Sequence, residues 1–313
     1  MIFSQKPKLL AFLAIAGIGL AALAPSAIAA DPGLGSPWET GPKFSGKKKI
    51  RKSISGAACV PAGPPNCIVA LDEGKHTQFF TIKDKTLVPG AVMRVLPEKN
   101  AGQVFKEFDA EGAAYADGYF YLVGSHGLSR KKAKYNPANF FVFRFPVDET
   151  TGKPGFAFSA DKAAPEIART DALRQVLKRA PGAIGEYAEK PLGKKAGGVN
   201  FEGVAVIGNR MFLGLRGPSK KKQAHVMSVD LGGLFGKGEL VPEYSKVELG
   251  KKTGIRDLAA VPDGILILSG PIGGKGSYAI HHWNLEDTKP EKLLELTMPE
   301  KGAKAETLLL LGH

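Results

Sequence analysis

An acidic residue recurs at one position of a repeated sequence pattern. Each complete copy continues with small and apolar residues, a tight turn and a second apolar run that ends in glycine. Carboxylates gathered in one space raise each other's pKa unless a cation is present, and such oxygen-rich sites suit calcium or magnesium. We therefore predict a metal site formed by Glu111, Glu202, Asp257 and Glu306. The alternative is that each carboxylate caps backbone N–H groups or pairs with a cation such as Arg256.

Cationic residues form a second candidate set, most of them in or beside the loops that follow the second apolar run of a copy. Glycine and proline predict tight turns there, and loops on a rigid scaffold often hold binding sites. Cationic side chains would suit a phosphate, sulfate or carboxylate group, so a small anionic ligand is the predicted partner. The candidate ligand-binding residues are His76, Arg130, Arg216, Lys220 and Arg256. The alternative is that these side chains are simply solvated.

His126 is the candidate general acid or base, because histidine can exchange a proton near neutral pH. Ser125 precedes it, but no Gly-x-Ser-x-Gly elbow accompanies the pair, so a catalytic triad is not indicated. The sequence also has no P-loop, dinucleotide fingerprint or zinc signature. We therefore expect no nucleotide cofactor. The alternative for His126 is a side chain that only satisfies a turn.

The elements that would position these residues recur at a period of about 50 residues, which indicates a repeat architecture. The copies begin near Ser55, Glu111, Phe201 and Arg256, and an incomplete one begins at Glu306. One interval is longer by about 35 residues, and residues 161–195 account for it because they lack strand alternation. Within this insertion, Thr170 predicts the cap of a helix over 171–179 that ends before Pro181.

Four-stranded units at this period predict an all-β protein, a β-propeller of five blades. Six blades remain possible if the insertion contains strands, and a sandwich with long hairpins is the structural alternative. The last copy stops at the end of the chain, so we expect residues 38–52 to pair with the C-terminal strand and close the ring. Within that stretch, the lysine run 47–52 predicts a guarded edge strand. The acidic residues would then converge at one end of the central channel.

The first 29 residues have the pattern of a signal peptide. Lys6 and Lys8 precede an apolar run over 9–24, and Ala27–Ile28–Ala29 fits a cleavage site. The run is shorter than the ~20 residues of a membrane span, although an uncleaved anchor is the alternative. We expect an exported protein, periplasmic or secreted, with residues 30–313 as one domain and no membrane span in the mature chain.

The two cysteines, Cys59 and Cys67, flank a strong turn signal, which predicts neighbouring strands of a hairpin. In an oxidising compartment a disulfide is favoured over two free thiols. The formal net charge is +13, which could attract polyanions. Nucleic acid is not favoured as a partner, because neither a recognition helix nor an aromatic ladder accompanies the lysines. The sequence sets no oligomeric state.

Several of these segments, in this order, resemble a bacterial family of exported proteins known only as a domain of unknown function. They are Glu111–Gly112, Ser125–His126–Gly127, Asn200–Phe201–Glu202–Gly203, Leu215–Arg216–Gly217–Pro218 and Arg256–Asp257–Leu258. The resemblance implies a propeller-like fold and no established activity.

A more distant similarity is to esterase-like phytases and to calcium-dependent, gluconolactonase-like lactonases. It implies that a glutamate that binds the metal in the lactonases corresponds to Glu111 or Glu202. Two departures weaken a complete metal ring, since Ser55 replaces the acid in the first copy and Thr307 follows Glu306 where glycine is expected.

Our functional hypothesis is a propeller that binds a small anion and hydrolyses a phosphate ester, carboxylic ester or lactone. A cation held by Glu111, Glu202 and Asp257 would polarise the ester and lower the pKa of a bound water, while Arg216 holds the anion. The alternative is a non-catalytic interaction platform in the cell envelope, which fits the abundant lysine and the lack of a recognised nucleophile–base pair.

Overall fold

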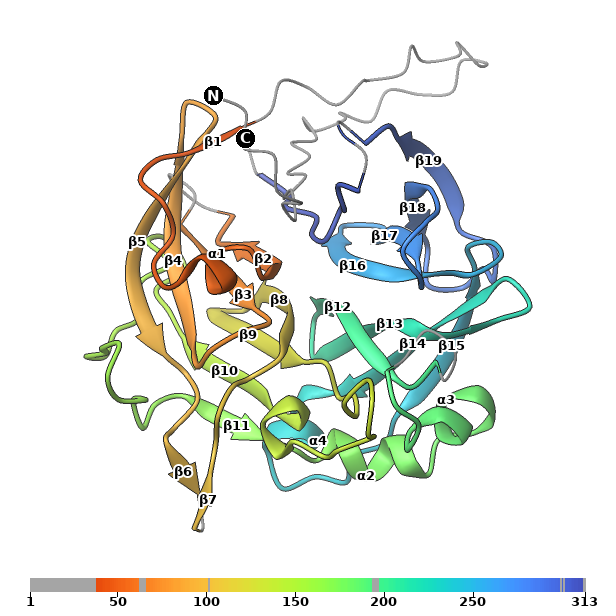
Figure 1. Cartoon of the computed structure of the whole chain (residues 1–313), viewed down its shortest axis with the longest axis horizontal. Coiled ribbons are helices and arrows are strands. Elements are labelled where there is room, and N and C mark those ends of the chain that lie inside the picture. Colours follow the sequence, from red (N-terminus) through yellow and green to blue (C-terminus); the bar gives the residue numbers. More distant parts are fainter. Residues whose placement is uncertain are drawn as a thin grey trace.

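The computed structural model describes residues 38–61, 66–100, 102–192, 197–298, 300 and 302–311. Their strands form four sheets of four or five strands and one two-stranded ribbon. The sheets follow one another around a common centre, and in each the strands run outward in chain order, except for the short β1 at the outer edge of the first sheet (Figure 1). The predicted all-β, propeller-like arrangement is confirmed. We number the sheets as blades one to four.

The bounds of the strands follow the repeat closely. Blade one holds β2 (Ile54–Cys59), β3 (Asn66–Leu71), β4 (His76–Lys83) and β5 (Thr86–Arg94), with β1 (Glu39–Thr40) parallel to β5. Blade two holds β8 (Ala110–Ala116), β9 (Tyr119–Gly124), β10 (Val142–Pro146) and β11 (Ala168–Thr170). Blade three holds β12 (Asn200–Ile207), β13 (Arg210–Lys220), β14 (Gln223–Asp230) and β15 (Glu243–Glu248). Blade four holds β16 (Thr253–Val261), β17 (Gly264–Pro271), β18 (Tyr278–Trp283) and β19 (Glu291–Leu296). The ribbon joins β6 (Lys99–Asn100) to β7 (Gln103–Val104).

Glycine at the second repeat position is explained by how closely the inner strands approach one another. A Cβ on Gly56 would lie 2.9 Å from Cα of Gly112, and one on Gly203 would lie 2.8 Å from the carbonyl carbon of Asp257. Contacts this short do not occur between real side chains and backbone, so only glycine fits. The acid–glycine pair of the sequence repeat is therefore a packing requirement of the ring as well as a source of charge.

The hydrophobic core lies between the blades. Ile68 of blade one and Phe120 of blade two belong to one buried cluster, and Val226 of blade three and Ile267 of blade four belong to another. Blade two contributes to this first cluster and to another that it shares with blade three, so its two faces are buried by its two neighbours, which stabilise it by removing apolar surface from water. This mutual burial fixes where the inner strands, and hence the candidate site residues, stand.

The predicted disulfide is confirmed. Cys59 on β2 and Cys67 on β3 are register partners and are joined by a disulfide bond. The turn between these strands, residues 62–65, lies outside the described residues. The predicted signal peptide over residues 1–29 also lies outside them. No helix in the described part of the chain is long and apolar enough to cross a membrane.

The predicted fifth blade and the closure by paired terminal strands are not confirmed. Residues 302–311 contain no strand, and β1 pairs with β5 instead of with the C-terminal segment. The segment lies between blades four and one (Figure 1). Its Thr307 hydroxyl accepts a hydrogen bond from the Ala57 amide at 3.1 Å and donates one to Asp257 at 2.7 Å. We call residues 302–311 the closing segment.

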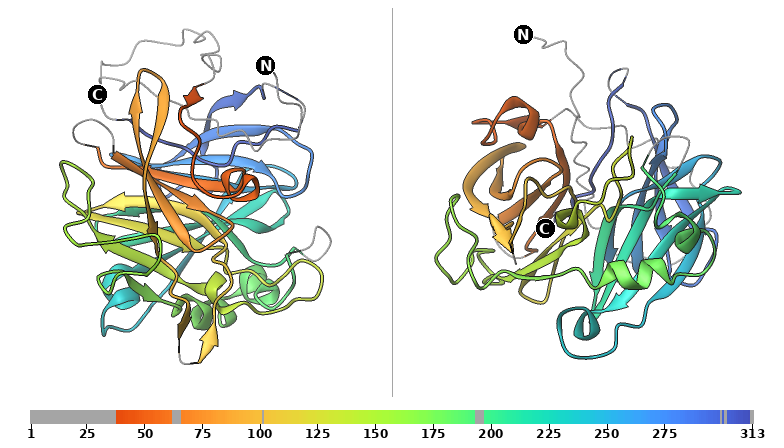
Figure 2. Two further views of the ribbon diagram at one scale, coloured as in Figure 1. Left: turned by 60° about the vertical axis from the view of Figure 1, so that its left-hand side comes forward. Right: turned by 60° about the horizontal axis from the view of Figure 1, so that its bottom comes forward.

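The insertion contains both a strand and helices. Its residues 168–170 form β11, the outer strand of blade two, and the helices α2 (Leu173–Lys178) and α3 (Gly182–Tyr187) follow. The predicted helix thus begins two residues late, and the Thr170 hydroxyl accepts from the Ala172 amide at 3.2 Å. Both helices contribute to the cluster between blades two and three and lie at the periphery of the ring (Figures 1 and 2).

The described residues form three further short helices. They are α1 (Lys48–Arg51), η1 (Pro137–Phe140) and α4 (Leu231–Phe235). The lysine run that predicted an edge strand therefore forms the turn of helix α1, and that prediction was wrong. Asp230 caps α4, because its side chain accepts from the Gly233 amide at 2.8 Å.

Candidate functional site

Four cationic side chains line a cavity of about 420 Å³. Arg130 comes from the segment after β9, Arg216 and Lys220 come from β13, and Lys304 comes from the closing segment. Tyr187 and several glycines are among the other lining residues, and none of the described lining residues is acidic. We call this the basic cavity. It brings together three of the cationic residues that the sequence singled out and adds Lys304.

Arg216 is held in place from behind by a buried carboxylate. Its Nη1 lies 2.6 Å from Oε1 of Glu202, whose side chain is 3% exposed, and its Nη2 donates to the Ile272 carbonyl at 3.4 Å. Asn200 donates to the same Glu202 oxygen at 2.7 Å. Burial is the largest single effect and acts to lower the pKa of Arg216, but the charge and hydrogen bond of Glu202, together with the charge of Glu111, raise the pKa overall. The guanidinium is therefore a fixed positive charge at the cavity wall.

Arg256 lies behind this pair and is buried with two carboxylates. Its Nη1 is 2.8 Å from Oε2 of Glu202, and its Nη2 contacts Oε2 of Glu306. Burial lowers the pKa of Arg256, and Glu202 opposes that shift. Lys304 Nζ stands 4.0 Å from Oε1 of Glu306. A chain of alternating charges thus runs from the cavity wall to the closing segment.

The strand register explains why an arginine occupies this place. Each inner strand has an irregularity that leaves one residue unpaired, and these residues are Ser55, Glu111, Glu202 and Arg256. A β-bulge of this kind redirects the extra side chain. Arg256, not Asp257, is therefore the blade-four counterpart of the acids in blades two and three. The sequence-based alignment of the fourth copy was wrong by one residue.

Asp257 consequently makes different contacts. It occupies the register position of Gly203 and accepts hydrogen bonds from the Leu258 amide, the Thr307 hydroxyl and the Leu308 amide. Burial raises the pKa of Asp257 to about 8, against the lowering effect of these hydrogen bonds. Its role in the described structure is to fasten the closing segment to blade four.

Glu111 remains in the neighbourhood of the arginines, since its charge acts on both Arg216 and Arg256. Arg256 lies between Glu202 and Glu306 and contacts both carboxylates, and its guanidinium and that of Arg216 repel a divalent cation. Within the described ranges, no three His, Cys, Asp or Glu side chains are grouped to hold a metal ion. This charge distribution does not fit calcium or magnesium.

His126 does not line the basic cavity. Its side chain is 1% exposed and packs edge-on against the rings of Phe140 and Phe201, and its Nδ1 is 2.9 Å from the Gly124 carbonyl. Burial lowers its pKa to about 4. A neutral, enclosed imidazole with left-handed backbone (φ 52°) has the contacts of a structural residue.

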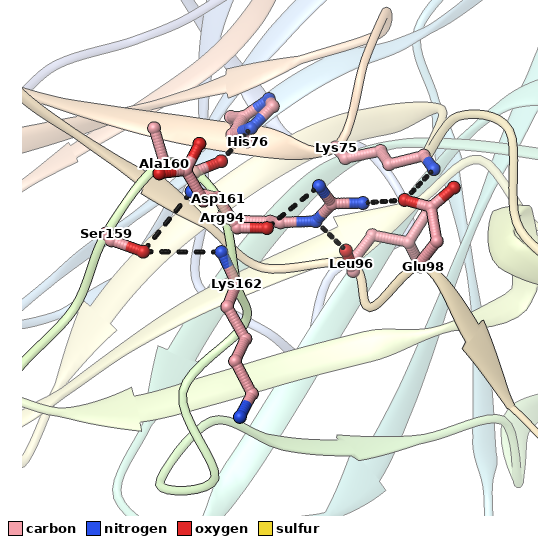
Figure 3. A network of polar contacts seen from close by, with 9 residues as sticks. All are labelled: Lys75, His76, Arg94, Leu96, Glu98, Ser159, Ala160, Asp161 and Lys162. Carbon is pink, nitrogen blue, oxygen red and sulfur yellow. Dashed lines mark hydrogen bonds and ion pairs between the residues drawn. The ribbon is translucent and has the colours of Figure 1, made fainter.

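His76 also lies away from the basic cavity, in a polar network at the outer strands of blade one (Figure 3). Its Nε2 is 2.8 Å from the Ala160 carbonyl. Beside it, Arg94 contacts Glu98, and Lys75 Nζ is 2.9 Å from the same carboxylate (Figure 3). His76 and Arg94, which also donates to the Asp161 carbonyl, attach residues 159–161 to blade one, so the network has a structural explanation.

Lys304 was missed by the sequence analysis. It stands two residues before Glu306, and residues two apart in an extended segment point to the same side. That spacing is the signal that could have found it, but the closing segment carries no other mark of a site. Tyr187 was missed as well, because it belongs to the insertion.

A family model described as "Protein of unknown function (DUF3616)" matches residues 66–141 and 141–308. The chain belongs to this family. The family match includes Glu111, Glu202, Arg216, Arg256 and Lys304, so it covers the whole charge chain behind the basic cavity. The resemblance to an uncharacterised family is thereby confirmed, whereas the similarity to phytases and gluconolactonases is not shown. No curated protein matches the chain.

Proposed function

We propose that this DUF3616 protein is an exported propeller that binds a small organic anion in the basic cavity. The supporting observation is that Arg216 lines the cavity while a buried carboxylate, Glu202, fixes its position at 2.6 Å. A guanidinium held in this way needs little reorganisation when an anion arrives, which favours binding. Arginine also offers paired donors that match a carboxylate or phosphate.

The balance of charge around the cavity favours an anion. Arg130, Arg216, Lys220 and Lys304 contribute positive charge, and Glu202 offsets only part of it. Lys220 also stands 3.5 Å from Glu186, but both side chains are about half exposed, and such surface pairs are weak. Positive charge in a concave site concentrates field and attracts anions from solution.

The cavity dimensions favour a ligand of modest size. A volume of about 420 Å³ lies within the usual range for small-molecule sites, roughly 300 to 1,000 Å³. Tyr187, Leu192 and Pro218 provide apolar and aromatic wall beside the cations. The ligand class is therefore an organic carboxylate or phosphate with a short carbon skeleton, held by its charge at Arg216.

Hydrolysis of a phosphate ester, carboxylic ester or lactone stays a prediction from the sequence. The proposed function is binding without a chemical step, because His126 is enclosed and two of the four carboxylates predicted to bind a metal, Glu202 and Glu306, contact Arg256. Elemental analysis of the purified protein would test the metal, and turnover of ester substrates with and without calcium would test catalysis.

Export is the second part of the proposal. It is supported by the signal-peptide pattern over residues 1–29 and by the disulfide between Cys59 and Cys67, which fits an oxidising compartment. N-terminal sequencing of the protein recovered from cell fractions tests it. Export predicts a mature chain that begins near Ala30 outside the cytoplasm, and a full-length cytoplasmic chain would contradict it.

Calorimetric titration tests the binding site. The probes are acetate, succinate, inorganic phosphate and glycerol phosphate, each at low and high salt. Arg216→Gln and Lys304→Gln are expected to weaken binding about 10- to 100-fold, the worth of a charge-assisted hydrogen bond. Lys83→Gln, an exposed lysine of blade one, is the control and should change nothing. Absence of binding for every probe, or equal affinity in Arg216→Gln, would overturn the proposal.

A further inference from the structure

A second cavity, of about 350 Å³, lies against blade four and shares no lining residue with the basic cavity. Its charged lining residues are Lys251, Lys252, Lys275, Lys292 and Glu295. Lys292 and Glu295 form a pair at 3.2 Å, so three further lysines set the sign of the charge. We call it the blade-four cavity, and the inference drawn from it is separate from the function proposed above.

A buried serine–histidine pair lies in the wall of the blade-four cavity. Ser269 is 2% exposed and His281 is 6% exposed. Ser269 Oγ is 3.0 Å from His281 Nε2 and 3.2 Å from the Ala279 carbonyl oxygen. The other ring nitrogen, Nδ1 of His281, is buried with no hydrogen-bond partner among the described residues. A buried polar atom of this kind requires an explanation.

Strand register places the polar residues on one face of the sheet. Ser269 on β17 pairs with Ala279 on β18, and His281 follows two residues later on the same face. On β19, Lys292 pairs with His281 and Glu295 pairs with Ala279. The face is completed by Lys251 and Lys252, which come from the turn before β16, and by Lys275 of the loop between β17 and β18.

Counting protons shows what would complete this arrangement. The Ser269 hydroxyl has one hydrogen, and it satisfies the Ala279 carbonyl only if Nε2 of His281 carries a proton and donates to Oγ. A proton on Nδ1 as well would make the ring a cation with one unused donor. An anionic acceptor at Nδ1 would satisfy that donor and balance the new charge.

The ring is neutral at pH 7 in the structure as described, because burial and then the charge of Lys292 lower the pKa of His281 to about 4. An anion in contact with the ring would favour the charged form and raise the pKa again. The lysines around the cavity would attract the same anion. Attraction of the anion by the lysines thus favours binding, whereas the charge of Lys292 opposes protonation of the ring, and only the bound anion favours the charged form.

We propose that the blade-four cavity binds an oxyanion group at Nδ1 of His281 and that binding is coupled to the uptake of one proton by the imidazole. The oxyanion is a carboxylate or a tetrahedral sulfate or phosphate group. Ser269 orients the ring through its Oγ, and Lys251, Lys252 and Lys275 supply long-range attraction. The proton comes from solvent, and no covalent bond changes.

The test uses sulfate and acetate as probes with the mature protein, followed by NMR of the histidine rings. Sulfate keeps a constant charge between about pH 5 and pH 8, so any pH dependence belongs to the protein. Linkage predicts that sulfate affinity falls about tenfold for each pH unit above the pKa of the free ring, until the pKa of the bound ring is reached. Binding of acetate as well identifies a carboxylate, and binding of sulfate alone identifies a tetrahedral group.

The controls separate this site from the basic cavity. His281→Gln should abolish the pH-dependent component, whereas His225→Gln, a buried histidine of blade three that pairs with Lys246, should retain it. Arg216→Gln should leave the response of His281 unchanged, although it weakens binding at the basic cavity. If neither probe moves the His281 resonances of the wild-type protein at about pH 5, or if the affinity is independent of pH, the proposal is overturned. The wild-type measurement decides even if a variant fails to fold.

Discussion

Arg256 Nη1 lies 2.8 Å from Oε2 of Glu202, and each residue occupies the unpaired position of its own inner strand. One blade presents a glutamate there and the next presents an arginine. The repeat therefore places opposite charges side by side at the centre of the ring. Because both side chains are almost fully buried, their pairing is a condition for the fold as well as support for Arg216.

Replacing Arg256 should show how strongly the fold depends on its ion pairs. Arg256→Gln leaves Glu202 and Glu306 buried with one cation fewer, and breaking a buried pair in this way costs about 3 to 5 kcal/mol. Urea unfolding followed by circular dichroism measures the loss. Lys178→Gln, which breaks an exposed pair with Glu189, should cost less than about 1 kcal/mol. Equal losses in the two variants would contradict this account of Arg256.

The attachment of the closing segment should be weakened by loss of the Thr307 hydroxyl. Thr307→Val keeps the shape of the side chain but removes the acceptor for the Ala57 amide and the donor to Asp257. Unsatisfied buried groups cost about 1 to 3 kcal/mol, so the free energy of unfolding should fall by that amount. Limited proteolysis should also cut the segment faster. The exposed Thr150→Val is the matched control, and similar behaviour of the two variants would argue against the assigned role.

The close approach of the inner strands predicts that replacing Gly203 lowers the stability of the fold. A Cβ there would lie 2.8 Å from the Asp257 backbone, so Gly203→Ala should force the strands apart and cost about 1 to 3 kcal/mol. Gly155→Ala offers a clean comparison, because no heavy atom lies within 4 Å of its added Cβ. Thermal unfolding of both variants makes the measurement. A neutral effect at Gly203 would mean that the blades are packed less tightly than described.

The buried His126 should make stability depend on pH. Burial lowers its pKa from 6.5 to about 4 in the folded state. Between these values the unfolded chain binds more protons, so stability that is present above about pH 6.5 is lost as the pH falls toward 4. The loss is about 3 kcal/mol for a shift of this size.

The variant His126→Asn suits the left-handed backbone at this position and removes the titrating group. Urea unfolding from pH 7 to pH 4 should show that wild-type stability falls relative to this variant. His76→Asn, in the blade-one network, should follow the wild type. Parallel pH profiles for wild type and His126→Asn would show that the ring does not titrate as described.

The architecture could be predicted because the alternation of apolar and polar residues and the position of turn-forming residues determine where strands and turns form. The copy that begins at Glu111 predicts two strands, and β8 and β9 lie within a residue or two of the expected bounds. The same reasoning located the disulfide, because Cys59 and Cys67 flank a turn between such strands. The fifth blade is not confirmed, since the copy at Glu306 has the sequence pattern of a strand but its described residues form none.

The site was harder to predict because it depends on side-chain direction. An alignment of the sequence copies matches Asp257 with Glu202. In the structure the bulge after Ile255 instead puts Arg256 at the unpaired position that Glu202 occupies in blade three. A bulge is a property of the backbone pairing and leaves no fixed spacing in the sequence. The lysine run 47–52 likewise predicted an edge strand, because residue propensities do not distinguish such a strand from the one-turn helix α1 that forms there.

Three consecutive ion pairs connect Arg216 in the wall of the basic cavity to the closing segment. They run through Glu202, Arg256 and Glu306. On the proposed function, an anion bound to Arg216 would weaken the ion pair between Arg216 and Glu202. It would thereby change the strength of the Glu202–Arg256 pair and of the Arg256–Glu306 pair that attaches the closing segment. By linkage the influence is mutual and equal in free energy. On the proposed function, removal of the closing segment would therefore change the affinity of the basic cavity for its anion, although the segment lies behind the cavity wall.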